Sequence, residues 1–169
     1  ALPIFTMKRK EFIKPFIGIE EEMPGFNVVY STTGSLSLIM RIFNISLQYG
    51  ADHENYETYH LLFGQIIKRL GDGYVLQKTD IIASQKYFKD VGGINDYLSK
   101  KYFEHFEGRI YKDITTYLTI TKESTKGHFF SYDAKALKDF LDKANKAVDT
   151  IKNQKISCEL LTKQEIEVL

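Results

Sequence analysis

The 169-residue sequence has no tryptophan, three prolines and a single cysteine, Cys158, which excludes an internal disulfide and fits a reducing compartment. It also lacks an excess of charge, because 23 Lys and Arg stand against 22 Asp and Glu. Proteins that bind nucleic acid by neutralising phosphates usually carry a clear basic excess, so the composition argues against that class. No apolar run approaches the roughly 20 residues of a membrane-spanning helix, and the N-terminus lacks a signal-peptide pattern.

Sequence patterns of common catalytic sites are missing too. A phosphate-binding loop needs G-x-x-x-x-G-K-[ST], and the nearest string, Gly71-Asp72-Gly73 followed by Lys78-Thr79, has no glycine before the lysine. No two of the four histidines stand four residues apart, and no Cys-x-x-Cys occurs. We interpret His60 as a packed core histidine and Cys158 as an inert core thiol. The sequence therefore predicts no catalytic, cofactor-binding or metal-binding residues.

What the sequence does have is hydrophobic periodicity, with 43% hydrophobic and 14% aromatic residues. The clearest element is an amphipathic helix over 52–70, with apolar residues at i, i+3, i+4 and i+7. Asp52 suits its N-cap and Gly71 the position after its last turn. Similar patterns predict helices over 94–106 and 133–152.

Alternating and apolar runs predict strands at 26–31, 35–45, 74–83, 111–121 and 156–161. The segment Thr32-Thr33-Gly34 suits a tight hairpin turn, where glycine accepts a positive φ. Prolines and glycines punctuate residues 1–25, which we expect to form an irregular N-terminal arm before a single α+β domain at 26–169.

The order of these elements indicates the fold class. Without the first strand and the helix at 94–106, the order is β-α-β-β-α-β, which is typical of a ferredoxin-like antiparallel sheet. We therefore predict an α+β, ferredoxin-like antiparallel sheet with an extra N-terminal strand and an inserted helix at about 94–106. Apolar residues occupy both faces of 36–45, and we expect the inserted helix to cover the second face.

A polar run, Gln77-Lys78-Thr79-Asp80, interrupts the strand that begins at Tyr74. It has two interpretations, an exposed strand face or bulge and a patch that contacts a partner. In the second, Gln77, Lys78 and Asp80 are the candidate contact residues. The lysine-rich face of 135–155 is interpreted as a solvated helix face, with a contact surface for nucleic acid or an anionic membrane as its alternative.

Three strings together resemble the N-terminal region of the TraG-family ATPases of conjugative transposons, the traffic ATPases of type IV secretion. The strings are Tyr56-Glu57-Thr58-Tyr59-His60 through Lys68, Gly71-Asp72-Gly73-Tyr74-Val75-Leu76-Gln77-Lys78-Thr79-Asp80, and Tyr97-Leu98-Ser99-Lys100-Lys101-Tyr102-Phe103-Glu104-His105-Phe106-Glu107-Gly108-Arg109 running to Thr121. Leu2-Pro3-Ile4-Phe5 and the hairpin before Leu36 also fit. The resemblance spans roughly 2–121, and the rest more loosely.

This resemblance implies a parent protein with a C-terminal RecA-like motor, which would bind ATP and Mg²⁺. None of the motor's catalytic residues maps onto this chain, so it implies no cofactor and no enzymatic activity here. It implies partners among inner-membrane secretion components, the parent's own motor and further copies of the chain. The implied location is the cytoplasm, at the inner membrane through those partners.

The expected function is thus a non-catalytic docking and assembly domain of a conjugation ATPase involved in DNA transfer. One alternative is a nucleic-acid-binding α+β module that stacks bases on Tyr74 and Tyr117. A lesser alternative is a small enzyme whose site matches no common pattern.

Overall fold

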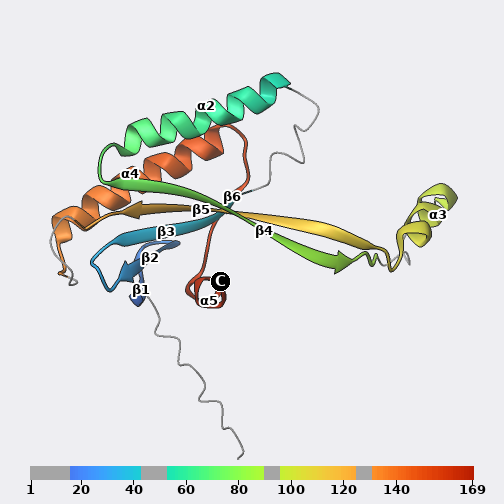
Figure 1. Ribbon diagram of the computed structural model, residues 1–169, viewed down its shortest axis with the longest axis horizontal. Coiled ribbons are helices and arrows are strands. Elements are labelled where there is room, and N and C mark those ends of the chain that lie inside the picture. Colours follow the sequence, from blue (N-terminus) through green and yellow to red (C-terminus); the bar gives the residue numbers. More distant parts are fainter. Residues whose placement is uncertain (1–15, 43–52, 90–95, 125–130) are drawn as a thin grey trace, which may run out of the picture.

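The computed structural model describes residues 16–42, 53–89, 96–124 and 131–169. Their strands are β1 (Phe16–Met23), β2 (Phe26–Ser31), β3 (Leu36–Ile42), β4 (Tyr74–Lys86), β5 (Ile110–Lys122) and β6 (Cys158–Leu160). Their helices are α2 (His53–Leu70), α3 (Tyr97–Phe106), α4 (Ala134–Asn153) and α5 (Lys163–Val168). Six strands form one antiparallel sheet, so the predicted α+β class is confirmed (Figure 1).

Strand β3 is the centre of this sheet because it has neighbours along both edges. The strands run in the order β1-β2-β3-β5-β4, and β6 also pairs with β3. β5 follows the whole of one β3 edge. On the other edge β2 pairs with 36–38 and β6 with 40–42, so the two strands share it end to end. The predicted turn closes the β2–β3 hairpin, where Gly34 has a φ of 88° and its N–H donates to Ser31 at 3.0 Å.

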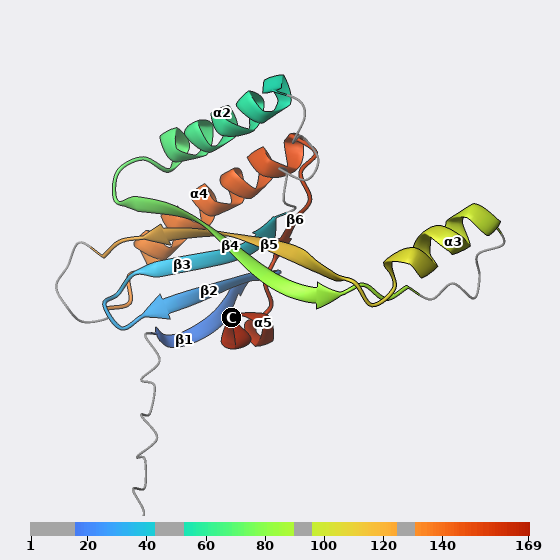
Figure 2. The same ribbon diagram turned by 45° about the vertical axis from the view of Figure 1, so that its right-hand side comes forward.

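The main core lies between one face of the sheet and the pair α2 and α4 (Figures 1 and 2). Alternate residues of β2, β3 and β5 supply the sheet side, as expected for strands with one apolar face. The Arg69 guanidinium donates to Thr150 Oγ1 at 2.6 Å, and Lys143 Nζ donates to the Leu70 carbonyl at 2.8 Å. These two bonds fix α2 against α4. The core side chains with no exposed area are Val28, Met40, Ile66, Leu118, Ile120, Phe140 and Ala144.

The helix ends follow the expected chemistry. Gly71 has a φ of 74°, and its N–H donates to the Ile67 carbonyl, which ends α2 as predicted. Asp133 caps α4 by accepting from the N–H groups of Lys135 and Ala136, each at 3.0 Å. The predicted N-cap of α2, Asp52, lies outside the described residues.

A smaller cluster covers the other face of the sheet, and it corrects one expectation. Ile39 and Val29 pack there against Ile19, Leu161 and Ile166. The cover therefore comes from the C-terminal α5 and from β1, whereas the helix predicted at 94–106 forms α3 away from the sheet. The short helix α5 is not among the elements predicted from the sequence. It begins with a capping box in which the side chains of Thr162 and Glu165 accept from each other's backbone N–H.

Two further expectations about the strands are wrong. Residues 16–23, placed in an irregular arm, form β1, which pairs antiparallel with β2. The run at 77–80 does not interrupt its strand, because β4 is continuous over thirteen residues. In each case a neighbouring strand, β2 for β1 and β5 for β4, supplies backbone hydrogen bonds that outweigh the weak strand propensity of the sequence.

We expect Ile166→Ala to lower the free energy of unfolding by about 2–4 kcal/mol, because a side chain only 7% exposed leaves a cavity between α5 and the sheet. The matched control, Val168→Ala on the same helix, should cost less than about 0.5 kcal/mol, since Val168 is 88% exposed. Urea unfolding measures both, and equal effects would contradict the packing of α5.

Candidate interaction site on the long hairpin

The β4–β5 hairpin is longer than the sheet to which it belongs. The two strands pair in unbroken register from Tyr74 opposite Lys122 to Lys86 opposite Ile110. Its inner half carries core residues such as Leu76 and Ile120. Its outer half projects from the rest of the molecule and carries α3 at its tip (Figures 1 and 2). We call this projection, residues 81–89 and 96–115, the arm.

Aromatic contacts attach α3 to the end of the hairpin. The Tyr87 ring lies 6.5 Å from that of Phe103 and 6.4 Å from that of Phe106, on successive turns of α3, and 6.3 Å from Tyr111 of β5. Lys89 Nζ stands 3.9 Å from the centroid of Phe103. Tyr87 therefore joins the helix to both strands.

The start and end of α3 are set locally. Asp96 caps it by accepting from the Ser99 N–H at 2.8 Å. The pKa of the Asp96 carboxyl is lowered first by a hydrogen bond from the Ser99 side chain and then by this backbone bond. Gly108, with a φ of 73°, returns the chain to β5, and its N–H donates to the Tyr87 carbonyl. The arm tip is thus an ordered helix, although none of its residues is buried.

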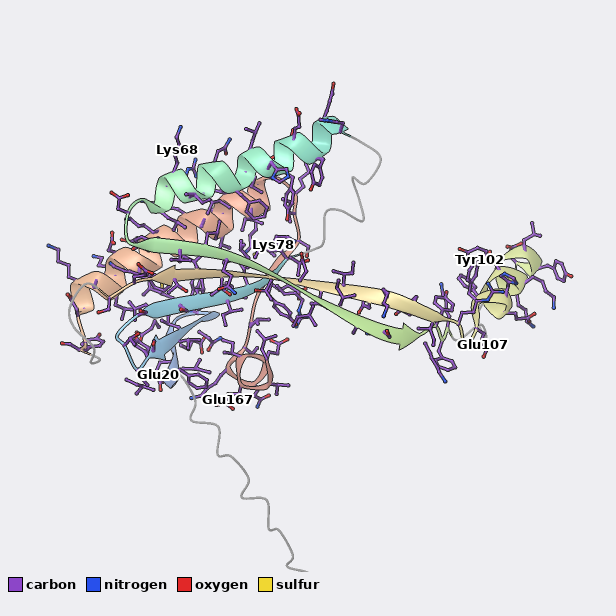
Figure 3. All side chains as sticks on the ribbon, viewed as in Figure 1. Glu20, Lys68, Lys78, Tyr102, Glu107 and Glu167 are labelled. Atoms are coloured by element: carbon purple, nitrogen blue, oxygen red, sulfur yellow. The ribbon has the colours of Figure 1, made fainter. Side chains whose placement is uncertain are left out.

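The arm also exposes large apolar side chains outside the aromatic seam, by which we mean the contacts of Tyr87 with Phe103, Phe106 and Tyr111. Leu98 is 74% exposed, Phe88 71% and Ile110 70%, and Tyr97 and Tyr102 are also exposed. Figure 3 shows Tyr102 at the tip, far from the helices and sheet of the body. Apolar surface grouped on a projection is typical of a protein contact site.

The structure divides the predicted patch between two faces of β4. Lys78 and Asp80 point to the helix side of the sheet and interact with each other, and Thr116 Oγ1 donates to Asp80 at 2.6 Å. Gln77 points to the opposite face, where its side-chain amide donates to Thr79 Oγ1 at 3.2 Å. The three residues therefore form no single surface, although they share one stretch of the β4 edge where the body meets the arm.

Neighbouring side chains at the β4 edge stabilise the charged form of Asp80. The hydrogen bond from Lys78, and then that from Thr116, hold the pKa of its carboxyl below the ordinary value, against a smaller opposing effect of burial. Lys78 and Asp80 are each more than a third exposed at the side chain. The lowered pKa keeps the Asp80 carboxyl charged at neutral pH, and both side chains are accessible from the β4 edge.

The aromatic residues proposed for base stacking are engaged elsewhere. Tyr74 stacks on Phe140 at 6.4 Å, and its hydroxyl donates to Asp139 at 2.9 Å. Tyr117 packs in the smaller cluster beside Ile39. Both rings are partly buried in these contacts, so a nucleotide base that stacked on them would compete with the packing of the fold.

Two other expected core residues have different outcomes. Cys158 is half-buried and its thiol contacts the Met40 sulfur at 3.5 Å, in line with the prediction. Burial raises the pKa of the Cys158 thiol to about 11. His60 is exposed on α2, with its ring 4.9 Å from that of Tyr56, so its assignment to the core is wrong.

A hollow of about 530 Å³ lies between the β2–β3 turn and the start of α4. Three of the ionisable groups that line it take part in contacts of the fold. Lys122 Nζ donates to the Ala136 carbonyl and to Asp139, each at 3.0 Å, Asp133 caps α4, and the Tyr30 hydroxyl donates to Glu22.

Within the described ranges, no three or more His, Cys, Asp or Glu side chains gather as a metal site. No helix in the same part of the chain has the length and apolarity to cross a bilayer. Comparison with family models, curated proteins and solved structures finds no match to this chain.

We expect Tyr87→Ala to release α3 from the hairpin without unfolding the body, because the ring contacts both turns of the helix. Amide hydrogen exchange of 97–106 should become at least about tenfold faster, while amides of β3 and α4 keep their protection. Tyr87→Phe, which retains the ring, should leave exchange unchanged. Equal protection in Tyr87→Ala would show that the seam does not hold α3.

We expect native Cys158 to react with iodoacetamide at pH 8 about a hundredfold more slowly than an ordinary thiol. The reason is that burial raises its pKa from 9.0 to about 11, and each unit removes about tenfold of the thiolate. The rate should rise with pH towards 11. Urea-unfolded chain is the control, and an equally fast native reaction would contradict the burial.

Proposed function

We propose that this chain is a non-catalytic docking and assembly domain of a conjugation ATPase that serves DNA transfer by type IV secretion. The observation that carries the proposal is the arm, an ordered projection whose tip exposes Phe88, Leu98 and Ile110. Burying such side chains against a partner is favourable, and a projecting helix meets a partner surface without disturbing the body.

The positions of the polar groups support a binding role over catalysis. Lys122 and Asp133 of the hollow take part in a hydrogen bond and a helix cap of the fold, and the two charges of the β4 edge form an ion pair. The proposed partners are inner-membrane secretion components and the parent's own motor. The motor would bind ATP and Mg²⁺, and the proposed location is the cytoplasmic side of the inner membrane.

The TraG-family resemblance includes the string from 97 to 109, and these residues build α3 and the turn that follows it. The resemblance and the exposed helix therefore concern the same part of the chain. This coincidence is the reason for assigning the arm, and not the hollow, to partner binding.

We further propose a ferredoxin-like core for the domain. In its support, β6, β3, β5 and β4 are neighbours in that order, every pair is antiparallel, and α2 and α4 pack on one face. On this proposal β1 and β2 are additions at one edge, and α3 is an insertion between the two middle strands.

Replacing Leu98 and Tyr102 together by serine should weaken binding of inner-membrane secretion components by a factor on the order of 30, because both side chains are exposed anchors. DNA transfer between cells should fall with it. The measurements are co-purification from cells carrying the conjugation machine and the transfer frequency. Nucleotide hydrolysis by the parent should not change.

Lys100→Ser and Lys101→Ser on the same helix are the controls, and hydrogen exchange of α3 shows that each variant is folded. Transfer at the normal frequency with Leu98→Ser/Tyr102→Ser would contradict the docking role. Salt-dependent binding of single-stranded DNA by the unmodified chain would favour the nucleic-acid alternative instead.

A further inference from the structure

The two edges of the sheet differ in how they are protected. β1, at one edge, has irregular register at Phe16/Gly18 and at Glu21/Met23, and Glu20 and Glu21 are exposed on it. Bulges and charges of one sign are common defences against pairing with another chain. β4, at the other edge, pairs with β5 without a break over thirteen residues, and within the described ranges no strand covers its outer side.

The sequence of β4 is complementary to itself when read in the opposite direction. With Thr79 opposite Thr79, an antiparallel copy places Lys78 opposite Asp80 and Asp80 opposite Lys78. The same register places Leu76 opposite Ile82, and Val75 opposite Ala83. Residues directly opposite each other in an antiparallel pair share one face, so these pairs are in contact.

The neighbouring registers that keep the helices of both copies on the same side of the joined sheet are unfavourable. A shift of one residue in each copy places either Lys78 opposite Lys78 or Asp80 opposite Asp80, and like charges directly opposite destabilise a sheet. The charges of the β4 edge therefore favour the register centred on Thr79. This edge also exposes Ile82 at 62% and Ile81 at 43%, apolar area that a second strand would cover.

Helix α2 adds an apolar flank above this edge. Its core-facing residues include Leu62 and Ile66, and Arg69 holds it to α4. The helical repeat places Tyr56 and Ile67 together on the flank turned away from α4, and they are 44% and 56% exposed. A copy related by a two-fold axis perpendicular to the sheet would bring its own α2 to the same face.

From this complementarity we propose that β4 pairs edge to edge with β4 of a second copy of this chain, antiparallel and centred on Thr79. The two sheets then form one continuous sheet, and each copy contributes Lys78 and Asp80 to a four-charge cluster at the axis. The proposal deepens the assembly role proposed above by naming a second copy as one partner. Its test uses the chain alone, so its failure is distinct from a failure in DNA transfer.

Charge reversal tests the register. Lys78→Asp places Asp opposite Asp80, and Asp80→Lys places Lys opposite Lys78, so each variant alone should dimerise at least about tenfold more weakly than the unmodified chain. An equimolar mixture of the two variants should recover the dimer, because every opposite pair is then attractive. Sedimentation equilibrium measures the association, and Lys112→Asp on β5 is the control for net charge.

A cysteine at the axis provides a second measurement that leaves the charges intact. In a Cys158→Ser background, Thr79→Cys should form an intermolecular disulfide on mild oxidation, since residues directly opposite lie within disulfide range. Gln77→Cys, on the same face of β4, should cross-link at least about tenfold more slowly. In this register two such cysteines lie four residues apart along the strands, about 13 Å.

Three results together support the proposal. Both charge-reversal variants lose the dimer, their mixture regains it, and Thr79→Cys forms the intermolecular disulfide. A chain that stays monomeric at concentrations of hundreds of micromolar overturns it and leaves the edge for a strand of another protein. A dimer that is insensitive to the reversals, or that cross-links equally at Gln77, also overturns it. Hydrogen exchange of β4 and β5 shows that each variant keeps its fold.

Discussion

The unbroken register between β4 and β5 is the constraint on which the other features of this molecule depend. It is set in the inner half of the hairpin, where Leu76 and Ile120 lie opposite each other in the main core. A slip of one residue would turn those side chains to the other face, so burial there determines the pairing. The outer half buries no comparable apolar side chains, so its register is set by continuation from the inner half.

Because the register is fixed in the inner half, a two-stranded ribbon can project from the sheet. An isolated ribbon is marginal in water, because it has no layer against which to bury a face. Here one end is fixed in the core, and the other is closed by the aromatic seam of Tyr87 with Phe103 and Phe106. The ribbon between them is ordered from both ends, which allows its side chains to remain exposed on both faces.

The sequence predicts the helices and strands of the core because their local signals agree with their packing. The periodicity, start and stop of α2 and α4 all point to one buried face, and the Thr32-Thr33-Gly34 turn fixes the first hairpin. Other features depend on contacts between distant residues. β1 pairs despite its glycine and glutamates because β2 is beside it, and the cover of Ile39 comes from the far end of the chain.

In the candidate site, too, some features have a local sequence signal and others depend on the folded structure. The run from Gln77 to Asp80 stands out by its polarity, but the sequence alone does not show that the strand continues through it. Alternation along that strand places Gln77 on one face and Lys78 with Asp80 on the other. The exposure of α3 was equally hidden, because its amphipathic pattern is that of a helix packed on a sheet. For α5 a signal was present, since Thr162 followed by Glu165 is the pattern of a capping box.

The two interaction surfaces proposed for the hairpin are compatible with each other. In the register centred on Thr79, residues 81–84 of one copy lie opposite 74–77 of the other, so pairing covers the base of the arm. The tip with α3 lies beyond the last of these pairs and keeps Leu98 and Tyr102 exposed. Because antiparallel pairing turns the two arms in opposite directions, a dimer would present two separate tips, each able to bind one partner. Pairing of the edge would also restrain the base of each arm and reduce the loss of conformational freedom when a tip binds.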